Sequence, residues 1–280
     1  MTPDCAAVGN DASSAITAGS SAARPFVSRR HRLARLPEVK LEGRVAIVTG
    51  ADGGLGRTLQ TTLAREGALV LPVDLRGDDC WHADVATPEG NRGMVDEAVR
   101  RHGRLDVLVL NAGAQLMAPI SEYPEPEWDR LLALMLTGPF LAIKAAWPYL
   151  VARPGGRIIA TGSVLSLAAE PFKAAYVAAK HGVVGLIKVA ALEGAAHGLT
   201  ANAVAPGWMR TPIVEKQMAD QMRLRGLTRE QVLEHMLASQ PGKRFVETAE
   251  VAELIAFLAS AQGSGISGAC LPVDLGALAT

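Results

Sequence analysis

From Leu41 onward, the chain alternates short apolar runs with longer segments of helical length and periodicity. The runs are continuous rather than alternating, which is typical of parallel strands buried on both faces. Such strands separated by helices predict an α/β fold with a doubly wound parallel sheet. We expect strands at residues 44–49, 68–74, 80–83, 105–110, 157–161, 200–204 and 270–274. We expect helices at residues 55–66, 88–102, 127–149, 174–196 and 249–260.

The alternation is interrupted once, by a charged and Met-rich segment at residues 212–245 that shows two helical stretches and no strand. This segment follows the strand at 200–204, on the side of the sheet where such folds bind ligands. That position favours a mobile lid, and a surface insertion is the alternative. We therefore predict a single domain over residues 41–280 with a small helical lid.

Residues 1–40 are rich in Ala, Ser and Gly, and their arginines cluster late. A secretory signal would place basic residues before an apolar core, so this order does not fit one. We expect a disordered extension or an upstream start codon, with an organelle transit peptide as the alternative. Three widely separated cysteines, Cys5, Cys80 and Cys270, form no metal or disulfide framework, and this fits a reducing cytoplasm.

Charge and hydropathy exclude two classes of partner. Lys plus Arg and Asp plus Glu both number 28, so no positive field is available to attract a nucleic-acid backbone. The most apolar stretch, residues 131–143, is shorter than the ~20 residues that a bilayer span needs. We expect that stretch to form a buried helix, and we expect neither nucleic acid nor a membrane as a partner.

The first predicted strand runs directly into a glycine-rich turn, Thr49-Gly-Ala-Asp-Gly-Gly-Leu-Gly56, and then into a helix. Gly50 allows the tight turn, Gly54 lets the backbone approach a pyrophosphate, and Gly56 permits close packing of the helix on the strand. The helix N-terminus, at Leu55, adds amide donors. Glycine suits any tight turn, but the strand–turn–helix context favours a nucleotide site.

Asp74 ends the second predicted strand, eighteen residues after Gly56. An acid in this place can bind both ribose hydroxyls of an adenosine, and its charge would repel a 2′-phosphate. NAD is therefore favoured over NADP as the cofactor. A helix-capping role for Asp74 and compensation of its charge by Arg76 are the alternatives.

Further motifs follow in order: Asn111-Ala-Gly113 and Ser163 after strands, Tyr176-Val-Ala-Ala-Lys180 opening a helix, and then Pro206-Gly207. With the glycine-rich turn, this set resembles the short-chain dehydrogenase/reductase family over nearly all of residues 41–274. The resemblance implies a Rossmann-type fold and a catalytic role for Ser163, Tyr176 and Lys180. It also implies a homo-oligomer, commonly a tetramer, for which residues 131–143 are an interface candidate.

The spacing of the catalytic motif has a chemical reason. Tyr176 and Lys180 are four residues apart, so both project from one helix face. An adjacent ammonium and an oxidised nicotinamide both favour the phenolate, which can then take the proton of an alcohol. Ser163 would hydrogen-bond the same oxygen. An amphipathic helix that happens to carry Tyr and Lys is the alternative.

The resemblance assigns further contacts with the cofactor. Asp84 and Val85 resemble the pair that meets the adenine, and the Asn-Ala-Gly stretch resembles the one that flanks the adenosine. Residues 206–211 resemble the loop that holds the nicotinamide, and Lys180 would also bind the nicotinamide ribose. The full set of expected cofactor residues is Gly50, Gly54, Leu55, Gly56, Asp74, Asp84, Val85, Asn111, Ala112, Gly113, Tyr176, Lys180, Pro206, Gly207, Met209 and Thr211. No metal site is expected.

The chain also departs from the family pattern. Met135 stands where the family usually has an asparagine that fixes a water of the proton relay, and a thioether cannot donate a hydrogen bond. Only ten residues separate Asp74 from Asp84, which leaves no room for the helix usually found there. Near the C-terminus, the family's Asp-Gly-Gly is replaced by Asp274-Leu275-Gly276.

Residues 171–185 and 206–217 resemble bacterial D-3-hydroxybutyrate dehydrogenases, which hold a carboxylate with two glutamines, a lysine and a histidine. Gln115, Lys173 and Gln217 match three of these positions, whereas the histidine position is Leu165. Each polar residue alone would suit a solvated surface. Together they predict an NAD-dependent oxidoreductase for a secondary alcohol, with a 3-hydroxy acid as the candidate substrate. A catalytically impaired nucleotide-binding protein is the alternative.

Overall fold

The protein is described from a computed structural model, in which residues 41–279 are placed. Within this range, seven strands form one parallel sheet in the order β3-β2-β1-β4-β5-β6-β7. The strands are β1 (Val45–Thr49), β2 (Leu69–Asp74), β3 (Trp81–His82), β4 (Val107–Leu110), β5 (Arg157–Thr161), β6 (Thr200–Pro206) and β7 (Cys270–Val273). The predicted doubly wound sheet is confirmed, whereas the extension expected at residues 1–40 lies outside the described residues.

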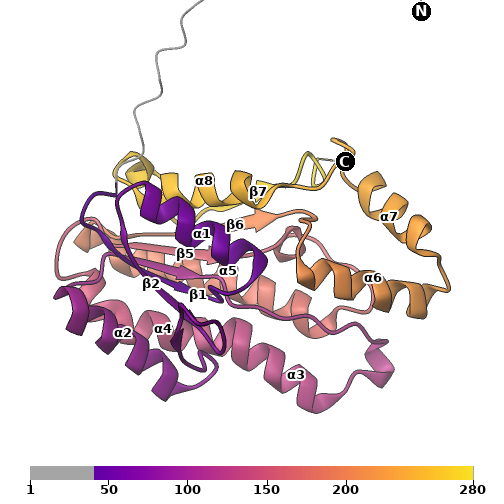
Figure 1. The fold of residues 1–280 in the computed structure, drawn as a ribbon, viewed down its shortest axis with the longest axis horizontal. Helices are drawn as coiled ribbons and strands as arrows, with labels where there is room; N and C mark the ends of the chain where they lie inside the picture. The colour runs from indigo at the N-terminus through magenta and orange to yellow at the C-terminus, as the bar shows by residue number, and fades with distance from the viewer. Residues whose placement is uncertain (1–40, 280) are drawn as a thin grey trace, which may run out of the picture. The chain divides into compact units, whose positions relative to one another are not determined.

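Helices cover both faces of this sheet (Figure 1). The long helices are α1 (Gly54–Arg65), α2 (Pro88–His102), α3 (Glu125–Leu132), α4 (Gly138–Leu150), α5 (Ala174–Gly194), α6 (Pro212–Arg225), α7 (Arg229–Ala238) and α8 (Thr248–Ala259). One apolar core joins α1 and α8 to the sheet, and a second joins α2, α4 and α5 to its other face. No helix separates β2 from β3, as the short spacing from Asp74 to Asp84 predicts.

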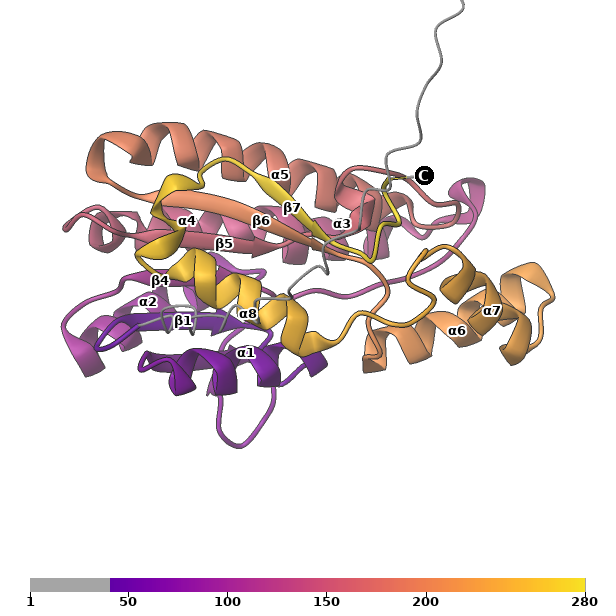
Figure 2. The same cartoon turned by 90° about the horizontal axis from the view of Figure 1, so that it is seen from above.

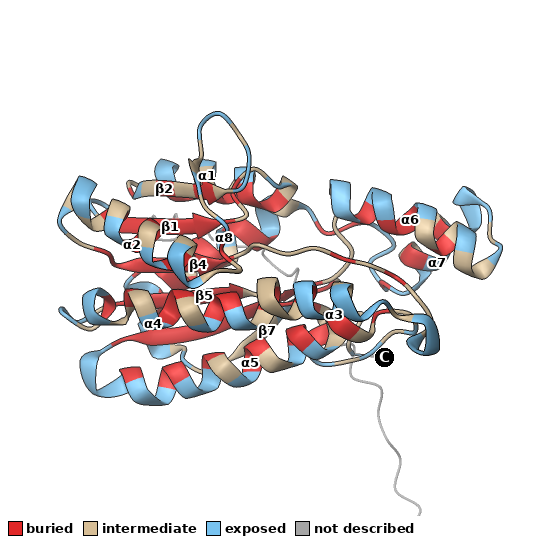
Figure 3. Cartoon of the chain, turned by 90° about the horizontal axis from the view of Figure 1, so that it is seen from below, coloured by how far each residue is buried: buried red, intermediate tan, exposed pale blue. Residues whose placement is uncertain are grey.

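The central strands are buried along their whole length. Every residue of β1, β4 and β6 is buried, and the strands form the inner layer in Figure 3. Both faces of each strand therefore meet helices, which explains why the sequence shows continuous apolar runs there. The strand order reverses between β1 and β4, so the connections leave these two strands in opposite directions. Ligands of such sheets bind at this reversal, beyond the carboxyl ends of the strands.

The helix predicted over residues 127–149 is longer and is interrupted by a wider turn. Helices α3 and α4 are joined by a π-helical turn, Ala133–Thr137, which contains Met135. Pro139 has no N–H to donate to the carbonyl four residues before it, which is that of Met135. The local hydrogen-bonding pattern consequently widens to the i→i+5 type, an arrangement common at functional sites.

Residues 212–245 form α6 and α7, the two helices that the sequence predicts there. These helices lie beyond one end of the strands (Figure 2) and share a small apolar cluster. The buried members of this cluster are Val214, Met218, Val232, Met236 and Phe245. A separate core lets the pair pack as a unit, and movement of this pair as a lid stays a prediction.

Two helical segments, Glu125–Leu150 and Ala174–His197, are long and apolar enough by composition to cross a membrane. Both supply side chains to the core beneath the sheet, including Ala142, Ala146, Val183 and Ile187. The core helices of soluble proteins have the same composition, so these segments are weak evidence for a membrane span.

Candidate active site

The glycine-rich turn between β1 and α1 is shaped as its glycines predict. Gly50 has a φ of 64°, and a Cβ placed on it would lie 2.7 Å from the Cα of Ala112. A Cβ on Gly56 would lie 2.0 Å from the carbonyl oxygen of Gly50. Neither position accommodates a side chain, so the first turn of α1 lies directly against the end of β1. The N-terminus of α1 therefore faces the carboxyl ends of the strands, where backbone N–H groups bind phosphate.

Asp74 lies at the end of β2 with its carboxylate held by two backbone donors. Its Oδ2 accepts a hydrogen bond from the N–H of Asp52 at 3.0 Å, and its Oδ1 accepts one from the N–H of Leu75 at 2.7 Å. Because the first of these donors belongs to the glycine-rich turn, Asp74 is oriented relative to the expected phosphate site. Asp74 and Arg76 line one cavity.

Asn111 ties three strand ends together. Its side-chain amide donates to the carbonyls of Thr49 at 3.0 Å and Gly50 at 3.1 Å, and its Oδ1 accepts from the hydroxyl of Thr161 at 3.1 Å. These contacts connect β1, β4 and β5. Asn111 therefore has a structural function, because it links the ends of three strands, besides any contact with a cofactor.

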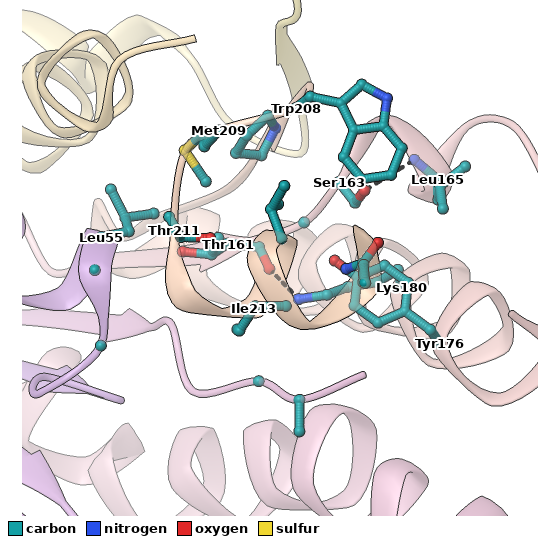
Figure 4. A pocket seen from close by; sticks show the side chains of 18 of the residues that line it. Leu55, Thr161, Ser163, Leu165, Tyr176, Lys180, Trp208, Met209, Thr211 and Ile213 are labelled. Carbon is teal, nitrogen blue, oxygen red and sulfur yellow. Dashed lines mark hydrogen bonds between the residues drawn. The ribbon is translucent and has the colours of Figure 1, made fainter. Parts of the chain in front are cut away.

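Ser163, Tyr176 and Lys180 line one cavity together with Asn111 and Thr161 (Figure 4). The Lys180 Nζ donates a hydrogen bond of 2.6 Å to the backbone carbonyl of Thr161 and lies 5.6 Å from the centre of the Tyr176 ring. The Ser163 Oγ accepts from the N–H of Leu165 at 3.1 Å, which caps a short helical turn and fixes the hydroxyl position.

Burial dominates the electrostatics of this group. It lowers the pKa of Lys180 to about 8, because an ammonium is poorly solvated there. It raises the pKa of Tyr176, and the hydrogen bond with Ser163 acts in the opposite direction. This desolvation opposes the shift toward phenolate that the neighbouring charges were expected to cause. The chain's own groups therefore keep Tyr176 protonated at neutral pH.

Two adjoining cavities of about 230 and 570 Å³ contain all the sequence-predicted site residues. The first is lined by Ser163, Tyr176 and Lys180, and also by Gly50, Gly54, Leu55, Gly56, Asn111, Gly113, Lys173, Pro206, Gly207, Met209, Thr211 and Gln217. The second is lined by Gly50, Asp74, Asp84, Val85, Ala112, Gly113, Gln115 and Gln217. The two cavities share five lining residues, Gly50, Gly113, Ala114, Ile213 and Gln217, so they meet beside the glycine-rich turn. The structure thus gathers these residues, and their individual roles stay predictions.

The three polar residues expected to bind substrate are buried. The Lys173 Nζ donates to the Oε1 of Gln217 at 3.0 Å, which joins the start of α5 to α6. Both amide atoms of Gln115 are buried without a hydrogen-bond partner among the described residues. An unpaired buried amide is costly, so Gln115 is suited to receive a polar ligand. Leu165 adds an apolar wall to the first cavity.

Met135 is 2% exposed and packs in a small cluster below Tyr176 with Leu131, Ala175 and Ala179. Its Sδ would lie 3.6 Å from a Cβ placed on Gly113, so it also supports the wall of the cavity. A packing role is therefore evident, whatever the effect of the thioether on proton transfer.

Sequence reasoning did not single out three residues that line the first cavity and contact Lys173 or Lys180. Thr161 accepts the Lys180 hydrogen bond, and its place at the carboxyl end of β5 is the signal that would have found it. The Trp208 ring lies 4.4 Å from the Lys173 Nζ. Glu170 accepts from the same ammonium at 2.9 Å and stands three residues before it in the chain. Within residues 41–279, no group of three or more His, Cys, Asp or Glu side chains is placed to hold a metal ion.

Comparisons with known proteins show the family of the chain. A short-chain dehydrogenase family model, described as Enoyl-(Acyl carrier protein) reductase, matches residues 50–277. The D-beta-hydroxybutyrate dehydrogenase of Rhizobium meliloti (strain 1021) is 39% identical over 83% of this chain and 98% of its own length. The uncharacterized oxidoreductase YxjF of Bacillus subtilis (strain 168) is 40% identical over 83% of this chain and 97% of its own length.

Solved structures give the same result. Levodione reductase superposes with a TM-score of 0.80 at 30% identity, covering 85% of this chain and 99% of that protein. The aldohexose dehydrogenase of Thermoplasma acidophilum has a TM-score of 0.79 at 32% identity, covering 85% of this chain and 95% of that protein. One is named as a reductase and the other as a dehydrogenase.

Proposed function

The chain belongs to the short-chain dehydrogenase/reductase family, and from this premise we propose that it transfers a hydride between a secondary alcohol and NAD. The observation that carries the proposal is the convergence of Ser163, Tyr176 and Lys180 on one cavity, beside the glycine-rich turn. A hydroxyl donor, a phenol and an ammonium around one cavity suit proton transfer at a carbonyl or alcohol oxygen.

The cavities fit a nicotinamide dinucleotide. Their volumes, about 230 and 570 Å³, together fall in the ~300–1,000 Å³ range of small-molecule sites. Asp74, Asp84 and Val85 would hold the adenosine half, and Pro206–Thr211 with Lys180 would hold the nicotinamide half. When bound, the nicotinamide supplies the hydride acceptor or donor. The carboxylate of Asp74 supports NAD over NADP, because a 2′-phosphate would meet its negative charge.

The chain's own residues would handle the proton. Tyr176 exchanges a proton with the substrate oxygen, and Ser163 holds that oxygen by a hydrogen bond. Lys180 donates to the carbonyl of Thr161, so its ammonium stays fixed on the same side of the helix as the phenol. With Tyr176 protonated at neutral pH, the site is poised to donate a proton to a ketone oxygen.

A 3-hydroxy acid, such as 3-hydroxybutyrate, is the first substrate that we propose. Two relatives named D-beta-hydroxybutyrate dehydrogenase support this class, from Rhizobium meliloti (strain 1021) and Cupriavidus necator (strain ATCC 17699 / DSM 428 / KCTC 22496 / NCIMB 10442 / H16 / Stanier 337). Within the chain, buried Lys173, Gln115 and Gln217 offer the polar groups that a second functional group of the substrate would need.

We also propose that the protein is a cytoplasmic homo-oligomer. Helices α4 and α5 expose several large apolar side chains, namely Phe140, Tyr149, Val189 and Leu192. Exposed apolar side chains on neighbouring helices are suited to cover one another between copies. Cys80 and Cys270 are free, which fits a reducing compartment. The mass of the purified protein in solution tests the assembly.

The function is tested by incubating the protein with NAD and a panel of secondary alcohols and 3-hydroxy acids, while following the absorbance of reduced nicotinamide. We expect substrate-dependent reduction of NAD with at least one member, and the reverse reaction with the matching ketone. Binding of NAD without turnover of any alcohol or ketone would instead support a catalytically impaired nucleotide-binding protein.

A further inference from the structure

A partly buried carboxylate, that of Glu170, already pairs with the cation that a substrate carboxylate would need. Lys173 is only 2% exposed, and its Nζ donates 2.9 Å to the Oε2 of Glu170 and 3.0 Å to the Oε1 of Gln217. The third side of the ammonium faces the ring of Trp208 at 4.4 Å. The donors and the charge of Lys173 are therefore taken up by the protein itself.

Glu170 is held in this place from the opposite side as well. Its Oε1 accepts from the Nη2 of Arg225, at the end of α6, at 3.2 Å. Its side chain is 18% exposed and lines the same cavity as Ser163 and Tyr176. The negative charge is therefore fixed by two cations, one from the start of α5 and one from the lid helix. Its attraction to Lys173 is strong because neither group is well solvated.

Glu170, Lys173 and Lys180 are the charged residues that line the first cavity, and Arg130 and Lys216 are cations that line the second cavity together with Gln115. Gln115 and Gln217 present amide groups, and Leu165 and Trp208 present apolar surface. A substrate carboxylate seated at Lys173 would lie near the carboxylate of Glu170, whose negative charge would oppose its binding. A hydroxyl or an ester carbonyl would meet the same hydrogen-bonding groups and no such repulsion.

We propose that Glu170 is a specificity-determining residue, whose charge weakens the binding of a substrate carboxylate relative to that of an uncharged polar group at the same place. This inference rests on the proposed function, because it concerns the substrate of that same cavity. Wild-type protein that oxidises a 3-hydroxy acid does so against this repulsion, and removing the charge of Glu170 relieves it.

The test compares 3-hydroxybutyrate with its methyl ester, which have the same carbon skeleton and differ by the negative charge. In Glu170→Gln, the amide oxygen still accepts from Lys173, and the substrate carboxylate becomes the counter-charge. We expect kcat/KM for the acid to rise about tenfold or more relative to the ester, mainly through KM. Glu215→Gln is the matched control, because Glu215 is an exposed lid carboxylate paired with Arg229 at 2.7 Å. Its acid-to-ester ratio should equal that of the wild type.

The outcomes separate the inference from the proposed function. An unchanged acid-to-ester ratio in folded Glu170→Gln, with turnover present, overturns the role of Glu170 alone. If Glu170→Gln does not fold, Glu170→Ser is used instead, because it removes the same charge and leaves a smaller polar side chain. If neither the wild type nor any variant turns over either compound, the proposed 3-hydroxy acid substrate fails. Calorimetric titration of acid and ester into both proteins then gives the same ratio from binding, and an unchanged ratio there also overturns the inference.

Discussion

Replacing Asp74 by alanine should largely abolish the preference for NAD over NADP. The carboxylate is fixed by the N–H groups of Asp52 and Leu75, so it cannot swing away from a ligand without losing both hydrogen bonds. Two unit charges 4 Å apart interact by about 4 kcal/mol at an effective dielectric constant of about 20. Asp74 is only partly buried, and Arg76 lines the same cavity, so solvent and that cation reduce the repulsion.

We therefore expect wild-type protein to bind NAD about 10- to 100-fold more tightly than NADP, which corresponds to about 1.4–2.8 kcal/mol. Asp74→Ala should reduce this ratio to within a few-fold of one, by weakening NAD through lost hydrogen bonds and by relieving NADP. Asp74→Asn removes the charge but keeps an acceptor, so its ratio should fall between the two.

Titration calorimetry with each cofactor measures these ratios. Asp79→Ala removes the same charge from the same loop, at an exposed position outside the cavity, and should keep the wild-type preference. Equal binding of both cofactors by the wild type, or an unchanged ratio in Asp74→Ala, would refute the role given to this carboxylate.

Three further substitutions address the catalytic group. Tyr176→Phe should lower kcat by about 10²–10⁴-fold with an unchanged Kd for NAD, since only the proton-transferring hydroxyl is lost. Tyr149→Phe, on α4, is the control and should keep full activity. Equal kcat values for Tyr176→Phe and the wild type in steady-state assays would contradict the role of Tyr176. Because burial lowers the pKa of Lys180 from 10.5 to about 8, unfolding takes up a proton between these pH values, so stability should rise by up to about 3 kcal/mol across that range. In urea unfolding, Lys180→Met should show a smaller rise than the wild type, and an equal rise in the two proteins would refute the contribution of Lys180. Met135→Asn should raise kcat for alcohol oxidation if proton release is limiting, while its buried amide atoms should lower the free energy of unfolding by about 1–3 kcal/mol. An unchanged kcat and an unchanged solvent isotope effect in the folded variant would contradict a slowed proton relay.

Much of the site could be predicted because its residues are tied to strand ends. Gly50, Asp74 and Asn111 each follow an apolar run, and parallel strands bring their carboxyl ends to one edge of the sheet. The periodicity of α5 likewise places Tyr176 and Lys180 on one face. Local pattern and chain order were sufficient for these residues.

Other features depend on packing that the sequence does not display. The partners of Glu170 include Arg225, which is 55 residues away at the end of α6, so no local spacing connects them. The raised pKa of Tyr176 comes from burial, a property of the folded chain. The backbone conformation of Leu275 could not be predicted either, because the sequence shows only a leucine where the family has glycine. Only the backbone shows that it adopts a left-handed φ of 55°.

Hydride transfer itself is tested most directly by isotope tracing. Wild-type protein is incubated with NAD and 3-hydroxybutyrate, or the methyl ester, carrying deuterium on the carbon that bears the hydroxyl. We predict that the reduced nicotinamide carries this deuterium and that its formation is slowed relative to the undeuterated alcohol. Reduced nicotinamide without deuterium, or none formed from any alcohol that the protein binds, would contradict the proposal that this cavity oxidises secondary alcohols.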